Sequence, residues 1–325
     1  MEESRLRRIP THPLAQYSQE FIKRGEPLIK RIQNTLLALV EIGRPKQWVK
    51  NGFIFAALIF DKQITDPESV LRVFIAFFLF CFYSSCVYMI NDITDLERDR
   101  LHPEKRFRPL PAGRITVPQV IRGCSLLFLF SACISAFLSW NFFWVAMIYV
   151  GINILYSFYL KSVAIIDGMI IAFGFVIRTY AGAVVIGAQF SDWLYICATF
   201  VSLFLAFCKR RHEIILLGEE NAKNHRAILR EYTTQMLDQI IAIVTAATAV
   251  TYSLYCIEAT NPDAQQHPYI KFTIPFVLYG LFRYLYLVYR KEEGGNPTEI
   301  LLTDRPLLIN GVLWFLMVLL ALYFS

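Results

Sequence analysis

The spacing of apolar segments constrains this chain most. Long apolar stretches recur after about residue 47, with polar segments between them, and 56% of all residues are hydrophobic while only 18% are charged. A helix needs roughly 20 apolar residues to cross about 30 Å of hydrocarbon. We therefore predict an all-α integral membrane protein. The nine expected transmembrane helices lie at 47–61, 68–90, 117–138, 142–160, 163–187, 193–208, 238–258, 271–289 and 306–324.

Positive charge is concentrated in alternate segments between these spans. Residues 1–50 carry ten Lys and Arg, residues 91–115 and 209–237 carry six each, and residues 290–305 carry three. Because cytoplasmic loops near helix ends carry such an excess, we expect the N-terminus and every long polar loop in the cytoplasm and the C-terminus outside. The net charge of +6 then reflects topology, and no nucleic-acid partner is expected.

Residues 1–43 are expected to form a polar N-terminal tail, cytoplasmic or interfacial, and residues 44–325 a single transmembrane catalytic domain. No removable signal peptide is expected, because the first 33 residues are polar and are interrupted by prolines. The seven cysteines fall within or at the ends of predicted spans, without a CxxC pair or a nearby His, which favours packing over disulfides or zinc. The oligomeric state stays open.

An acidic cluster follows directly on the second span, where the sequence reads NDITDLERD from Asn91. If the helix continues, Asp92, Asp95 and Asp99 lie on one stripe, at i, i+3 and i+7. Three converging carboxylates repel one another without a cation. Mg²⁺ accepts carboxylate oxygens and completes its shell with water and substrate phosphate, so we predict a Mg²⁺ site that neutralises a departing pyrophosphate. The alternative is a solvated helix end whose acids are balanced by neighbouring arginines.

Basic side chains flank this cluster on both sides. In the proline-rich loop that follows, Arg106 and Arg108 can bind phosphate oxygens in a bidentate way, although ordinary positive-inside charge explains them equally well. Upstream, Lys46 and Lys50 lie one turn apart. Lys50 and Asn51 enter the apolar stretch, where unpaired polar groups are unfavourable, and this favours an inward-facing role over lipid anchoring.

Arg178 lies near the middle of the fifth predicted span, where a charge normally faces a cavity or a partner. Asp167 precedes it by three helical turns on the same face. The structural alternative is a pairing of Arg178 with an acid of another helix. Ala181 and Gly182 would let a neighbouring helix or a ligand approach closely. Neighbouring span ends supply further candidates for phosphate binding, namely Tyr156, Lys161, Lys209 and Arg210.

The NDxxDxxxD element at the end of the second of nine spans resembles the UbiA superfamily of intramembrane prenyltransferases. Members that prenylate aromatic rings usually carry a second aspartate-rich motif after the sixth helix, but residues 209–237 contain no aspartate here. Further segments resemble the polyprenyl-phosphate phosphoribosyltransferases of that superfamily. These segments are RPKQWVKN (44–51), NDITDLERDRLHPEKRFRPLPAG (91–113), YSFYLK (156–161), IRTYAG (177–182), KRRHE (209–213) and LTDRP (302–306).

This resemblance implies a UbiA-type bundle in a bacterial inner membrane, with its active-site loops in the cytoplasm. It implies that phosphoribosyl diphosphate is the donor, that a polyprenyl phosphate is the acceptor, and that Mg²⁺ bound by Asp92, Asp95 and Asp99 holds the diphosphate while Asn91 holds the loop or the ribose. Two alternatives stay open: transfer of a prenyl group to an aromatic acceptor, and a transporter or lipid-binding protein without chemistry. The implied substrate-binding residues are Lys46, Lys50, Asn51, Arg106, Arg108, Tyr156, Lys161, Asp167, Arg178, Lys209 and Arg210.

Overall fold

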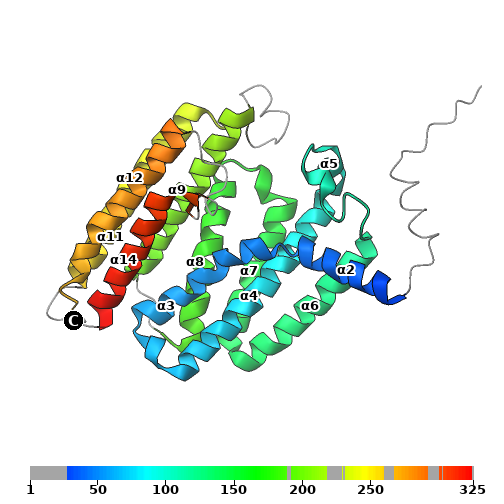
Figure 1. Cartoon of the computed structure of the whole chain (residues 1–325), viewed down its shortest axis with the longest axis horizontal. Coiled ribbons are helices and arrows are strands. Elements are labelled where there is room, and N and C mark those ends of the chain that lie inside the picture. Colours follow the sequence, from blue (N-terminus) through cyan, green and yellow to red (C-terminus); the bar gives the residue numbers. More distant parts are fainter. Residues whose placement is uncertain are drawn as a thin grey trace, which may run out of the picture. The chain divides into compact units, whose positions relative to one another are not determined.

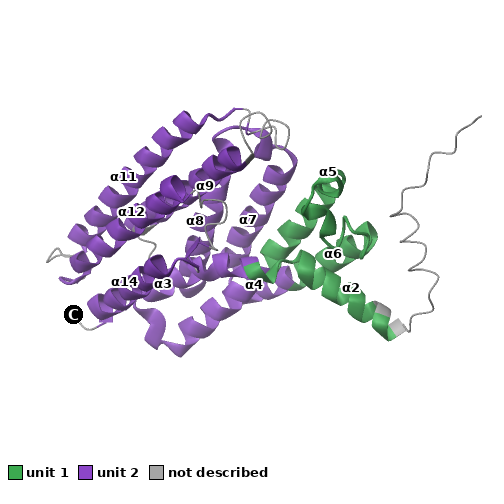
Figure 2. Cartoon of the chain, turned by 45° about the horizontal axis from the view of Figure 1, so that its top comes forward, with its two compact units in different colours: residues 1–46, 82–130 green, residues 47–81, 131–325 purple. Residues whose placement is uncertain are grey.

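The protein forms two compact units in a computed structural model (Figure 2). Unit 1 contains the described residues up to 46 together with 82–130, and unit 2 contains 47–81 and the described residues from 131 onwards. Helices α4 (Pro67–Thr94) and α6 (Val117–Leu138) contribute residues to both units. The structure describes residues 28–188, 192–217, 229, 231–259, 267–291, 300–301 and 303–323.

Within the described ranges every regular element is a helix, as predicted (Figure 1). Seven helical segments among these residues are long and apolar enough to cross a membrane, and each overlaps one of the expected spans. They are α4, α6, α7 (Trp140–Phe158), α8 (Ile166–Ile186), α11 (Thr234–Glu258), the segment Ile270–Arg290 that contains α12 (Ile274–Arg290), and α14 (Arg305–Tyr323).

The other two expected spans are not among these seven segments, so the count of nine is not confirmed. The first, 47–61, is a 3₁₀ helix, η1 (Pro45–Ile54), followed by the six-residue helix α3 (Phe55–Phe60). Asn51 and Gly52, near its start, favour an α-helix poorly. The span expected at 193–208 lies within α9 (Asp192–Leu217), which continues through the KRRHE segment.

Unit 1 is built around a helix that falls within the expected polar tail. Helix α2 (Leu28–Ile42) buries Ala38 and Ile42 against Met89 of α4 and Val120 of α6, in a core that also holds Leu110 and Ile115. Full burial of a large apolar side chain such as Ile42 stabilises the fold by about 1.5–3 kcal/mol relative to leaving it in water. The helical residues from 28 onwards are therefore part of the folded unit, while residues 1–27 lie outside the described part of the chain.

Unit 2 is centred on α9, which packs against α8 on one side and α11 on the other, while α12 packs against α11 and α14 (Figure 1). Its largest core cluster includes Phe204 of α9, Leu237 and Ile241 of α11, and Leu287 of α12. Helix α3 packs on α8. A side chain at Gly182 would overlap the Ile54 carbonyl oxygen, so this position provides the close approach expected from the sequence.

Several helix ends in unit 2 are set by local capping residues. Asp66 accepts a hydrogen bond from the Ser69 amide at 3.0 Å, and Pro67 follows it at the first position of α4. Thr233 caps α11 in the same way, through the Met236 amide at 3.1 Å. Helix α8 ends at Gly187, whose φ of 65° suits the residue without a Cβ. These caps fix where polar loops replace apolar helix.

Candidate active site

The acidic cluster does not lie on one continuous helix. Helix α4 ends at Thr94, Asp95 adopts φ −100° and ψ 5°, and α5 (Leu96–Leu101) begins after it. The Thr94 hydroxyl donates to the Asn91 carbonyl at 3.0 Å, which gives the backbone a local partner at the helix end. The expectation that three aspartates share one stripe is therefore wrong. Among the described residues, no group of three His, Cys, Asp or Glu side chains is arranged to hold a metal ion.

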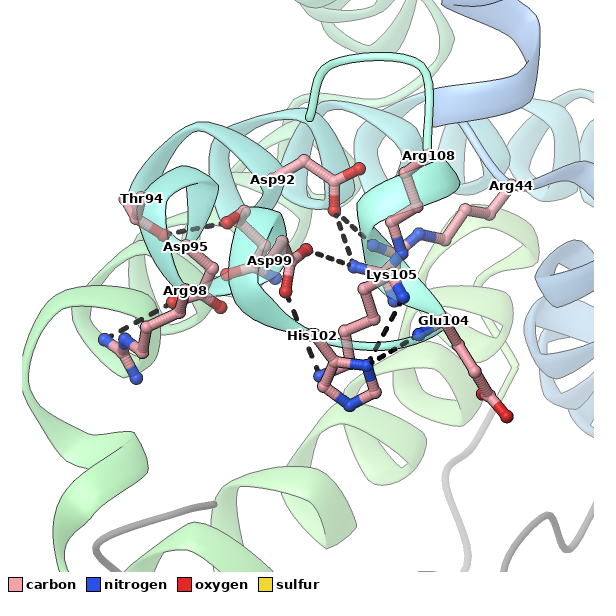
Figure 3. Close-up of polar contacts among 11 residues, drawn as sticks. Arg44, Asp92, Thr94, Asp95, Arg98, Asp99, His102, Glu104, Lys105 and Arg108 are labelled. Carbon is pink, nitrogen blue, oxygen red and sulfur yellow. Dashed lines mark hydrogen bonds and ion pairs between the residues drawn. The ribbon is translucent and has the colours of Figure 1, made fainter. Parts of the chain in front are cut away.

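Two of the three aspartates do come together. Asp92 and Asp99 are 2% and 4% exposed, and the Arg108 guanidinium bridges them (Figure 3). Its Nη1 lies 2.7 Å from Asp99 Oδ2 and 3.4 Å from Asp92 Oδ1. Lys105 Nζ lies 4.0 Å from Asp99 Oδ1. Two buried carboxylates need such compensation, because removing a charge from water is strongly unfavourable unless it is paired.

A second arginine, which the sequence pattern did not single out, binds Asp92 of this pair. Arg44 donates from Nη2 to Asp92 Oδ1 (Figure 3). Its guanidinium lies 5.0 Å from the centre of the Tyr88 ring. Arg44 follows α2 with a φ of 52°, in the left-handed region. Arg44 belongs to the RPKQWVKN segment, but its partner Asp92 lies 48 positions further along the sequence. Local periodicity carries no information about a contact of that range.

Three other candidates of unit 1 have other neighbours or are exposed. Asp95 points toward Arg98, with 3.5 Å between Oδ1 and Nη2 (Figure 3). Arg106 is exposed, and its guanidinium lies 4.7 Å from the Phe107 ring centre. Lys46 is exposed as well. The structure thus brings Asp92, Asp99 and Arg108 together with Arg44. We name these four residues the carboxylate–arginine cluster.

The donor set of this cluster fits a hard divalent cation. Asp92 and Asp99 supply carboxylate oxygens that are shielded from solvent, and such oxygens are the ligands Mg²⁺ prefers. Two carboxylates leave most of an octahedral shell to water and to substrate phosphate, which is the usual arrangement for Mg²⁺ at phosphate sites. Arg44 and Arg108 are 29% and 32% exposed, so both guanidinium groups are accessible to an anion that approaches the same place.

Arg178, in unit 2, is buried at 7% exposure and makes its hydrogen bonds to neutral groups. Its Nε donates to Asn51 Oδ1 at 2.7 Å and its Nη2 to the Tyr149 hydroxyl at 2.8 Å, while Nη1 binds the Gly174 carbonyl. None of these recorded contacts is with a carboxylate. The described residues therefore do not show the alternative in which Arg178 pairs with an acid of another helix. The guanidinium instead joins η1, α7 and α8.

Asp167 lies on α8, but its partner is Arg210 rather than Arg178. Arg210 Nε donates to Asp167 Oδ2 at 2.6 Å, and its Nη1 donates to Glu213 Oε2 at 2.6 Å. The Tyr232 hydroxyl donates to Asp167 Oδ1 at 2.7 Å. Burial and this bond to the carboxylate raise the pKa of the Tyr232 phenol. Tyr232 was not selected from the sequence, because a single tyrosine in a polar loop carries no distinguishing pattern.

The other basic candidates of unit 2 are partly exposed. Lys50, Tyr156 and Lys161 are each half-buried. Lys209 Nζ lies 4.0 Å from Glu213 Oε1, so the two residues pair at i, i+4 on α9.

Unit 2 also contains an apolar cavity of about 430 Å³. Helices η1, α3, α8, α9, α11, α12 and α14 all contribute to its wall. Phe53, Tyr255 and Trp314 are among its aromatic lining residues, and Val201 and Val318 among its aliphatic ones. A cavity of this size and lining suits hydrocarbon rather than a charged ligand.

The fold and the sequence together define the class. The UbiA prenyltransferase family profile matches residues 52–299, which is more than half of the chain. The chain belongs to this family and, with its apolar helices, is a multi-pass membrane protein.

The most informative relatives are decaprenyl-phosphate phosphoribosyltransferases. That of Corynebacterium glutamicum is 32% identical over 297 residues, which cover 90% of this chain and 88% of that protein. That of Mycolicibacterium smegmatis is 32% identical and covers 93% of this chain and 97% of its own length. The chain is therefore similar to decaprenyl-phosphate phosphoribosyltransferases along nearly all of its length.

Solved structures show the same fold at lower sequence identity. A UbiA homologue from Archaeoglobus fulgidus bound to GPP and Mg²⁺ superposes with a TM-score of 0.66 at 18% identity, covering 88% of this chain and 99% of that one. The UbiA homologue from Aeropyrum pernix K1 has a TM-score of 0.58 at 13% identity. These likenesses confirm the UbiA architecture.

Proposed function

We propose that this protein transfers 5-phosphoribose from phosphoribosyl diphosphate to a polyprenyl phosphate and releases pyrophosphate. The observation that carries the proposal is the pair of buried carboxylates, Asp92 and Asp99, held by two partly exposed arginines. The names of the relatives that resemble the chain over most of its length support the same reaction. We further propose a bacterial inner membrane, with the N-terminus and the polar loops in the cytoplasm.

Charge balance favours this donor over a prenyl diphosphate. Phosphoribosyl diphosphate and a lipid phosphate together bring three phosphate-bearing groups to the reaction, and one or two divalent cations cannot neutralise them. Additional Lys and Arg are therefore required. Lys209, Arg210 and Arg211 lie near the end of α9, whereas prenyltransferases that use aromatic acceptors usually carry a second aspartate-rich motif after the sixth helix.

In the proposed reaction an oxygen of the lipid phosphate attacks C1 of the ribose. A new bond joins C1 to this oxygen, the bond between C1 and the diphosphate oxygen breaks, and the electron pair leaves with pyrophosphate. No general base is needed, because the lipid phosphate is already anionic at pH 7. Arg44 and Arg108 stabilise the negative charge on the leaving diphosphate, which is electrostatic catalysis by positioned donors.

Asp92 and Asp99 would hold a Mg²⁺ ion, and Asp95 stays a prediction as a third ligand. When bound, the cation neutralises charge on the diphosphate oxygens. We propose that Arg106, Lys46, Lys50, Lys161 and Lys209 bind substrate phosphates, and that Asn91 holds the loop or the ribose. Arg178 and Asn51 are hydrogen-bonded to each other and buried, so we propose that they act on the substrate through the local electrostatic field and the placement of η1.

The acceptor tail requires an apolar site. We propose that part of the polyprenyl chain occupies the apolar cavity of unit 2, which is lined by Phe53, Ala56, Val201, Trp314 and Val318 among others. Because the bilayer is as apolar as the cavity wall, van der Waals packing would hold the chain in this cavity. A bulky polar substitution at Ala56, such as Ala56→Gln, should therefore raise KM for the lipid and leave KM for the sugar donor unchanged.

A matrix of donors and acceptors tests the proposal. Purified protein with Mg²⁺ is incubated with phosphoribosyl diphosphate or a prenyl diphosphate, and with a polyprenyl phosphate or an aromatic acid. We expect an organic-soluble product only from phosphoribosyl diphosphate with the polyprenyl phosphate. A product only from the prenyl diphosphate with the aromatic acid would replace this proposal by the aromatic-acceptor alternative, and no product in any combination would favour a protein without chemistry.

A further inference from the structure

The turn between α7 and α8 has an unfavourable backbone conformation at a β-branched residue. Ile165 adopts φ 67° and ψ −48°, and the Ile166 amide donates to the Ala164 carbonyl at 2.7 Å, which closes a three-residue γ-turn. A γ-turn with positive φ is rare and strained, and a branched Cβ makes it worse. Such a conformation persists only where the surrounding structure enforces it.

The enforcing contact comes from a residue 67 positions away in the sequence. The Tyr232 hydroxyl accepts a hydrogen bond from the Ile165 amide at 2.6 Å and donates one to Asp167 Oδ1 at 2.7 Å. One hydroxyl therefore holds the strained residue and the first turn of α8 together. The centres of the Tyr232 ring and the Phe207 ring of α9 lie 6.5 Å apart. Packing of the two rings therefore also holds the Tyr232 hydroxyl in place.

The same aspartate carries the connection on to α9. Asp167 is fully buried, and the side chain of its partner Arg210 is 2% exposed. A side chain at Gly168 would contact the Phe207 ring at 3.0 Å, so α8 and α9 already approach closely here. With two carboxylates bound, at Asp167 and Glu213, and almost no exposed surface, Arg210 is inaccessible to a substrate phosphate.

We propose that Tyr232, Asp167 and Arg210 form a brace whose function is to position substrate-binding lysines rather than to bind substrate. The brace fixes the turn that follows Lys161 and the helix segment that carries Lys209, and thereby fixes how these two cations are presented to a substrate phosphate. This inference rests on the proposed function for the identity of that phosphate. It changes the role expected from the sequence for Asp167 and Arg210, from substrate binding to positioning.

Tyr232→Phe tests the brace, because it keeps the ring and removes both hydrogen bonds of the hydroxyl. We expect KM for phosphoribosyl diphosphate to rise about tenfold, as the loss of one or two net hydrogen bonds implies, with kcat changed less than about twofold. Amide hydrogen exchange in peptides that cover residues 159–167 should speed up by a similar factor. Tyr289→Phe is the control, since it removes an exposed hydrogen bond from a tyrosine hydroxyl to an aspartate, Asp238, elsewhere in unit 2, and it should change neither quantity.

A second variant separates positioning from a general loss of structure. Glycine adopts positive φ without steric conflict, so Ile165→Gly in the Tyr232→Phe background should hold the turn without the brace and bring KM back to within about threefold of the original protein. Unchanged KM and unchanged exchange in Tyr232→Phe would overturn the proposal, as would a double variant no better than the single one. If the protein transfers no phosphoribose at all, the exchange measurement still decides whether the brace holds the turn.

Discussion

Two clusters of aspartate and arginine in this protein have similar chemistry and different surroundings. In unit 1, Arg108 bridges Asp92 and Asp99 while 32% of its side chain stays exposed. In unit 2, Arg210 pairs with Asp167 and only 2% of its side chain is exposed. Both pairs compensate buried carboxylates. A partly exposed guanidinium, however, can release one anion and bind another. A fully buried guanidinium can do so only if the structure around it opens locally.

The comparison assigns different roles to residues that the sequence placed in one class. The carboxylate–arginine cluster contains accessible cations beside buried hard ligands, which is what a metal and a diphosphate require. The brace has no accessible group and instead joins elements of the fold. Changes in the cluster should therefore affect the reaction, and changes in the brace should affect stability and substrate affinity.

Arg210→Gln should have the largest effect on stability. It leaves Asp167 buried without its charged partner, and removal of one member of a buried ion pair costs about 3–5 kcal/mol. Thermal unfolding of the purified protein in detergent, followed by tryptophan fluorescence, measures the change. The double variant Asp167→Leu with Arg210→Met should recover much of the loss, because apolar replacement of a buried pair is often neutral. A single variant as stable as the original would mean that the pair is not sealed.

Asp92→Asn should lower kcat by at least about 100-fold, as expected when a group that stabilises developing charge is lost. The fold should persist, because asparagine has the same size and can still accept from Arg44. The measurement is the transfer rate at saturating substrates, with the melting temperature as a check on folding. Glu97→Gln is the control, since Glu97 is exposed and pairs with Arg100 at 2.8 Å. If Asp92→Asn retains more than about a tenth of the transfer rate, Asp92 does not have the proposed role in the reaction.

Arg108→Gln should raise KM for phosphoribosyl diphosphate and lower kcat, together by about tenfold to 100-fold in kcat/KM. Its stability should change less than that of Arg210→Gln, because Asp92 keeps Arg44 and Asp99 keeps Lys105 nearby. Arg100→Gln serves as the exposed control. The comparison fails if Arg108→Gln is as unstable as Arg210→Gln while its kinetics are normal.

Substitution of Asp304 should have the smallest effect on stability, and the size of this effect should depend on pH. Hydrogen bonds from Arg283, at 2.8 and 3.1 Å, lower the pKa of Asp304 below its usual value. A lowered pKa in the folded state means that the pair stabilises the protein above the unfolded pKa of about 3.9 and that this contribution is lost as the pH falls through the folded value. Asp304→Asn should therefore cost about 1 kcal/mol at pH 7. Melting curves below pH 4 should show a smaller difference between the two proteins.

Much of the fold could be predicted from the sequence, because hydrophobic segment length reports directly on helices in a bilayer. Seven expected spans correspond to long apolar helices. The first span differed because its polar start, around Lys50 and Asn51, forms a 3₁₀ helix. The sequence also predicts a polar tail over the residues of α2, because the prolines and charges of the preceding segment dominate the pattern there. The helix itself is largely apolar, and it buries Ala38 and Ile42 while Leu37 and Val40 stay exposed.

The members of the carboxylate–arginine cluster could be predicted better than their geometry. Residue type and spacing identified Asp92, Asp99 and Arg108, because acids next to an apolar span require a reason to be there. Arg44 and Tyr232 were missed because their contacts cross 48 and 65 residues of sequence. The pairing of Asp167 with Arg210 depends on how α8 and α9 pack. A single sequence does not encode such contacts in any local pattern.

The central claim is that the sugar and its 5-phosphate move to the lipid while the diphosphate stays in water. Phosphoribosyl diphosphate labelled at the 5-phosphate, and in a parallel reaction at the β-phosphate, tests this directly with polyprenyl phosphate and Mg²⁺. We predict that the 5-phosphate label enters the organic phase and that the β-phosphate label appears only as aqueous pyrophosphate. Entry of the β-phosphate label into the lipid, or absence of the 5-phosphate label from it, would contradict the account.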